Sequence, residues 1–71
     1  MKDKALYLID CRALDISHSK TRKGVRMAFD SLLVLLCAFE YVGLISTNEA
    51  VLLQEKASMQ VREAIKGLPD D

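Results

Sequence analysis

The stretch from Thr21 to Val42 constrains the fold most, because it is apolar on more than one side. An inner stripe recurs at helical spacing: Val25, Phe29, Leu32, Leu36, Phe39 and Val42. Further apolar side chains surround that stripe at Leu33, Leu35, Cys37 and Ala38. This pattern is typical of a helix that is buried on several sides. Gly43 can take the left-handed conformation that ends a helix, so we predict a long apolar helix over 21–42.

The segment after that glycine carries the clearest helix start. Ser46 and Glu49 have the spacing of a capping box, in which each side chain bonds the other residue's backbone N–H. Apolar residues then recur every three or four positions: Ala50, Leu53, Ala57, Val61 and Ala64. Gly67, followed by Leu68 and Pro69, is a stop signal. We predict a helix over 47–66.

The first segment is more ambiguous. Apolar residues at Leu6, Ile9, Ala13 and Ile16 have helical spacing, and Asp3 could serve as an N-cap. The run over 5–9 could also form a strand, but a lone strand would have no partner strand in this chain. We therefore predict a helix over 4–16 and an all-α, three-helix bundle as the fold class.

The chain is short, and its composition suggests assembly. It has 71 residues, of which 51% are hydrophobic. We expect a single helical domain over 1–71 with a short disordered tail over 68–71. A domain of this size buries only about 60% of the surface that its unfolded chain exposes, so it gains much from a partner.

The relative helix lengths indicate where a partner would bind. At about 1.5 Å per residue, a helix over 21–42 is about 33 Å long and one over 4–16 about 20 Å. The first helix would then leave the far end of the central helix uncovered. We expect Leu35, Phe39 and Val42 to form an interface there, in a two-fold homodimer. Closure of the three helices into a self-contained core is the alternative.

The net charge is zero, but the charges are distributed unevenly. Residues 1–29 carry seven cations and three anions, a net of 7 − 3 = +4, and residues 30–71 carry the reverse, 3 − 7 = −4. A basic cluster precedes and begins the central helix, at Lys20, Arg22, Lys23 and Arg26. With the hydroxyls of Ser19 and Thr21, this helix start could bind a phosphate or another anion. A solvated turn is the alternative interpretation.

Nucleic-acid binding is a weaker hypothesis. The turn at Gly43 has the form of a helix-turn-helix, but the helix that would enter the groove begins Thr47-Asn48-Glu49 and continues through Glu55. Carboxylates at the leading edge would face DNA phosphates, which is the wrong sign. Only the basic turn over 18–26 remains as a contact for nucleic acid.

Catalytic and metal-binding motifs are absent from the sequence. It has no HExxH, no CxxC and no glycine-rich phosphate loop. We expect no catalytic residue, no cofactor and no metal site. Cys11 and Cys37 should lie too far apart for a disulfide and should be small buried hydrophobic residues. His18 should be exposed, and Glu40 could be partly desolvated inside the apolar run.

These observations favour a binding protein over an enzyme. No signal-peptide pattern is visible, and the most apolar stretch, 31–45, is too short to span a bilayer and contains Glu40. We expect a cytoplasmic, non-enzymatic protein–protein interaction module, such as an adaptor, inhibitor or regulator. Its partners would be a second copy and an unidentified protein. The alternative function is weak binding of nucleic acid or an anionic ligand through the basic turn.

Overall fold

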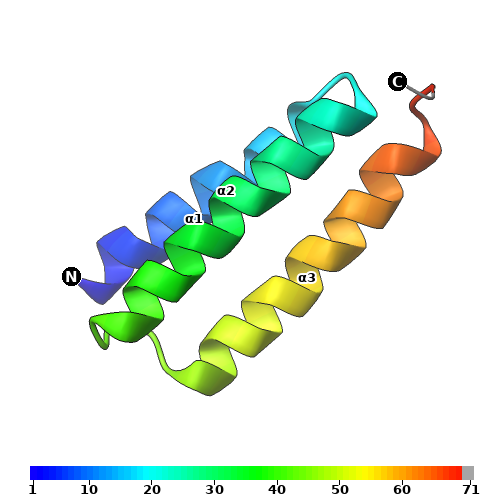
Figure 1. Cartoon of the computed structure of the whole chain (residues 1–71). Coiled ribbons are helices and arrows are strands. Elements are labelled where there is room, and N and C mark those ends of the chain that lie inside the picture. The colour runs from blue at the N-terminus through cyan, green and yellow to red at the C-terminus, as the bar shows by residue number, and fades with distance from the viewer. Residues whose placement is uncertain (70–71) are drawn as a thin grey trace.

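The computed structural model describes residues 1–69 and contains three helices, α1 (Lys2–His18), α2 (Arg22–Tyr41) and α3 (Thr47–Lys66). Figure 1 shows them running up, down and up, with the N-terminus and the α2–α3 turn at the same end. The Cα atoms extend over 38 × 18 × 15 Å. No strand occurs within 1–69. The prediction of an all-α, three-helix fold is confirmed.

The first helix is longer at both ends than the predicted range of 4–16. It begins at Lys2, and Met1 is its N-cap residue, without a side-chain hydrogen bond. Asp3 is therefore not the N-cap that the sequence suggested. It lies in the first turn, where its carboxylate interacts favourably with the positive end of the helix dipole. Ser19 follows the helix with extended backbone angles and donates its hydroxyl to the Asp15 carbonyl at 2.7 Å.

The second helix agrees with the predicted range when its caps are included. Thr21 is the N-cap, and its side-chain oxygen accepts the Gly24 N–H at 2.9 Å. Val42 is the C-cap, and its N–H donates to the Ala38 carbonyl. Gly43 follows with a φ of +82°, the left-handed conformation expected from the sequence. α2 contains 20 residues, the same number as α3.

The third helix has the predicted bounds and the predicted capping box. The Ser46 hydroxyl oxygen accepts the Glu49 N–H at 3.1 Å, and Glu49 Oε1 accepts the Ser46 N–H at 3.0 Å. The same carboxylate binds Lys2 of α1, with Nζ 2.9 Å from Oε2. These hydrogen bonds, first that from Lys2 and then that from the Ser46 backbone, lower the pKa of Glu49. One side chain therefore joins the starts of α1 and α3.

The core is aliphatic and receives side chains from all three helices and the α2–α3 turn. Its buried members are Ile9, Ile16, Val25, Leu32, Leu36, Ile45, Ala50 and Ala57. Among residues 1–69, no buried polar or charged residue is present. Ile16, Val25 and Leu32 are the largest fully buried side chains. Each such burial contributes about 1.5–3 kcal/mol, and these three residues come from α1 and α2.

The far end of α2 is covered more than the sequence predicted. Because α1 begins at Lys2, its first turns reach the end of α2, and Met1 and Leu8 line a hollow together with Phe39. Leu35 and Phe39 are half-buried against the core. The end of α2 is thus only partly covered: α1 begins two residues earlier than predicted, but Val42 remains 64% exposed.

We predict that Gly43→Ala destabilises the protein by about 1–2 kcal/mol, the cost of placing a residue with a Cβ in the left-handed region. The position has open space around it, so the effect isolates backbone strain. Gly67→Ala is the matched control, because Gly67 also has open space but a φ of −94°. That variant should be neutral or more stable by about 0.4–1 kcal/mol. Equal destabilisation of both variants in urea unfolding would contradict a left-handed backbone conformation at Gly43.

We also predict a pH-dependent contribution from Glu49. Its pKa is lowered in the folded state, so its stabilising effect is present above the unfolded pKa of about 4.3 and is lost as pH falls through the folded value. Glu49→Gln should therefore unfold at a lower temperature than wild type at pH 7, with the difference shrinking by pH 3. Glu55→Gln, an exposed substitution on the same helix, is the control in thermal unfolding followed by circular dichroism.

Candidate functional site

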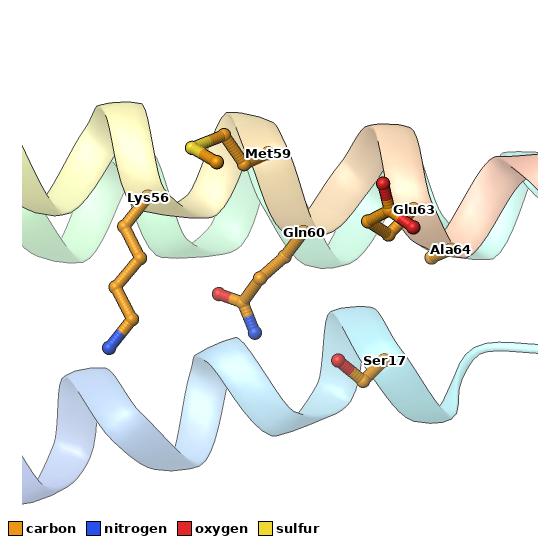
Figure 2. Close-up of a pocket in the computed structure, with 6 residues that line it drawn as sticks. All are labelled: Ser17, Lys56, Met59, Gln60, Glu63 and Ala64. Carbon is orange, nitrogen blue, oxygen red and sulfur yellow. The ribbon is translucent and has the colours of Figure 1, made fainter.

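The three helices pack against one another to different extents. α2 packs against both neighbours, whereas α1 and α3 make the smallest helix–helix contact. Between α1 and α3 lies an open groove with a volume of about 460 Å³. Figure 2 shows Lys56 and Gln60 of α3 extending toward α1, with Ser17 of α1 on the opposite side. The other lining residues are Met59, Glu63 and Ala64.

Exposed apolar side chains continue from this groove along α3. Leu52 and Met59 lie seven residues apart, hence on the same side of the helix, and their side chains are 65% and 63% exposed. Lys56 and Glu63 have the same seven-residue spacing and are also exposed. Together these four residues, Leu52, Lys56, Met59 and Glu63, form a stripe that we call the α3 face. The helical periodicity did not predict this face, although Leu52 and Met59 are apolar residues that fall outside the inner stripe of this segment.

A second exposed surface follows the outer side of α2. Its residues are spaced four, three, four and three apart, at Met27, Ser31, Val34, Ala38 and Tyr41, and all are exposed. We call this set the α2 face. Val34 is 71% and Tyr41 92% exposed. Beside it, a hollow of about 330 Å³ between α1 and α2 is lined by Arg12, Leu35 and three of these residues, Ser31, Val34 and Ala38.

The predicted interface residues divide between the core and the surface. Val42 is exposed at the end of α2, whereas Leu35 and Phe39 are half-buried and each lines a different hollow against α1. The structure therefore does not bring the three together as one exposed patch. The expectation that α2 is buried on several sides is wrong for the isolated chain, because Val34 and Tyr41 lie in solvent.

The basic turn is present at one end of the bundle, but its polar groups are partly engaged. The Thr21 and Ser19 hydroxyls are hydrogen-bonded to backbone groups of Gly24 and Asp15. Arg22 donates from Nε and Nη2 to the Leu68 carbonyl, at 3.4 Å each. The hydroxyls that the sequence offered for an anion thus cap helix ends.

The remaining predicted cations, Lys20, Lys23 and Arg26, are exposed. They lie at the end of the bundle where α1 meets α2. Arg22 is half-buried, and its hydrogen bonds to the Leu68 carbonyl connect the segment after α3 to the first turn of α2. Leu68 is half-buried against the core, and the last part of the predicted disordered tail, 70–71, lies outside the described residues.

The other singled-out residues lie apart from one another. Both cysteines are free. Cys11 is half-buried beside Tyr7, and their hydrogen bond raises the pKa of the Tyr7 phenol. Cys37 is exposed, so its expected burial was wrong: it lies on the outer side of α2. Glu40 is half-buried and accepts the Thr47 hydroxyl at 2.9 Å, and His18 is exposed.

Neither a metal cluster nor a membrane span is found in the described part of the chain. Within 1–69, no three His, Cys, Asp or Glu residues are grouped as metal ligands would be. Over the same residues, none of the three helices combines the length and the apolar character needed to cross a bilayer.

The chain matches no protein-family model, and no curated protein or solved structure is significantly similar to it. Any functional interpretation therefore depends on the surfaces described above.

We predict that the basic turn governs any binding to polyanions. The triple charge reversal Lys20→Glu, Lys23→Glu and Arg26→Glu should elute from heparin at much lower salt than wild type, because counterion release scales with the number of cations in contact. A control with equal net charge reverses the dispersed cations Lys4, Arg12 and Lys66, and it should elute closer to wild type. No retention of the wild type at low salt would end this interpretation.

Proposed function

We propose that this chain is a non-enzymatic protein–protein interaction module, an adaptor, inhibitor or regulator, that acts in the cytoplasm as a helical homodimer. The observation that carries the proposal is the apolar surface that the three-helix fold of residues 1–69 leaves in solvent. The exposed large apolar residues are Met1, Tyr7, Leu8, Leu14, Met27, Val34, Tyr41, Val42, Val51, Leu52 and Met59.

Exposed apolar residues are ordinary when scattered, so their arrangement is what matters. Met27, Val34 and Tyr41 repeat every seven residues, and Ser31 and Ala38 fill the intervening positions. A repeat of four and three is the pattern with which one helix packs along another. The α2 face is thus suited to an amphipathic helix of a partner, lying over the hollow between α1 and α2.

The energetic gain from such docking is substantial for a domain of this size. Burying a fully exposed Val or Met side chain contributes about 1.5–3 kcal/mol. Native domains have only about 5–15 kcal/mol of total stability, so burying the exposed parts of three such side chains at one interface adds an appreciable fraction of that total. The small Ser31 and Ala38 side chains would let a partner backbone approach closely.

Binding of nucleic acid or an anionic ligand is the second candidate function. Its support is the exposed set Lys20, Lys23 and Arg26 at one end of the bundle, which dimer symmetry would double. It ranks second because the neighbouring hydroxyls and Arg22 already bind the chain's own backbone.

We predict that the double substitution Val34→Asp and Tyr41→Asp abolishes capture of a partner protein from the native host. Charges on the α2 face would have to be desolvated in the complex. Both side chains point to solvent in the free protein, so helical content and unfolding temperature should stay near wild type.

The matched control is Asp3→Asn together with Asp10→Asn, two exposed polar substitutions on α1. This control should capture the same partner as wild type. Undiminished capture by the α2-face variant would exclude that face as the binding surface. A wild-type chain that sediments as a monomer at high concentration would exclude the homodimer.

A further inference from the structure

The α3 face has a charge pattern that is complementary to itself. We propose that a second copy of this chain docks on it, with the two α3 helices antiparallel about a two-fold axis between Met59 and Gln60. This inference rests on the proposed homodimer and names the surface that forms it. The occupant is a second copy, and the α2 face then stays available for a different protein.

The pairing follows from the positions of the two charges. Lys56 and Glu63 lie on the same side of α3, three residues before and four residues after Met59. A two-fold axis requires that when residue i contacts residue j, residue j also contacts residue i. Antiparallel α3 helices centred between Met59 and Gln60 place Lys56 of each copy opposite Glu63 of the other. Parallel helices in register would instead place like charges together.

The groove between α1 and α3 provides an apolar contact for the antiparallel pair of α3 helices. Met59 lies at the groove and is 63% exposed, and the groove has room, with a volume of about 460 Å³. Ala64 and Ser17 are small side chains on its two sides. In the antiparallel pair, Met59 of one copy lies beside Met59 of the other and enters its groove. An unbranched thioether side chain adapts well to such an irregular space.

Existing contacts of these charges do not prevent the new pairs. Glu63 binds Lys66 at 3.0 Å, three residues along the helix, with both side chains more than 70% exposed. Exposed pairs of this kind contribute little, so Glu63 can exchange or share this partner without a large loss. The α2 face, by contrast, consists of uncharged residues and contains no pair of opposite charges that would fix a two-fold orientation.

The test is a charge swap followed by sedimentation equilibrium at low salt. Lys56→Glu and Glu63→Lys should each weaken the dimer roughly tenfold or more, because each brings like charges together at two symmetric positions. The double variant K56E/E63K should regain the wild-type dissociation constant, since the swapped charges are again complementary. An equimolar mixture of the two single variants should form a heterodimer more readily than either forms a homodimer.

Asp30→Lys on α2 is the matched charge-reversal control and should leave the dissociation constant unchanged. Circular dichroism establishes that each variant remains folded, and the mixing experiment provides a second readout that a loss of fold could not produce. Met59→Asp should abolish the dimer without changing the helical content.

The outcomes separate this inference from the proposed function. A wild-type monomer overturns both the homodimer and the α3 pairing. A wild-type dimer that K56E, E63K and M59D leave intact overturns the α3 pairing alone, and the homodimer then forms through another face. Weakening by both single variants without rescue by the double variant overturns the antiparallel pairing of Lys56 with Glu63.

Discussion

The burial of one side of α2 against both neighbouring helices is the constraint on which the rest of the structure depends. Val25 and Leu32 are fully buried, and Leu36 is nearly so. These three positions face the interior of the bundle, with Ile9 and Ile16 of α1 in the same cluster. Since two helices converge on one side of α2, side chains on its opposite side, such as Val34 and Tyr41, are exposed in the structure of residues 1–69.

This geometry explains why the apolar surface is distributed as it is. A three-helix bundle in which the middle helix contacts both others leaves the outer helices less closely packed against each other. The α1–α3 groove and the exposed outer side of α2 are therefore two results of the same arrangement. Lys2 and Glu49 bridge α1 and α3 at one end, and Arg22 holds the Leu68 carbonyl at the other. Polar contacts thus supplement the apolar packing at both ends of the bundle.

Local signals predicted the helices well, because caps act within a few residues. Ser46 with Glu49 identified the start of α3, and Gly43 identified the end of α2 through a backbone requirement that few other residues meet. The start of α1 was less predictable, because Met1 offers no side-chain cap. That local error had a long-range effect: the helix begins two residues earlier than predicted, so the sequence predicted Phe39 to be more exposed than it is. Which side of an apolar helix faces solvent depends on the angular positions of both neighbours, and spacing along one segment does not contain that information.

The carboxylate of Glu49 takes part in two structural tasks at once. It accepts the Ser46 N–H that begins α3, and it receives the Lys2 ammonium from the first turn of α1. Because this one side chain contacts both helix starts, fraying of either start breaks the ion pair between them. The Lys2–Glu49 ion pair therefore links the two helix starts that are most distant in sequence, and it joins residues 47 positions apart.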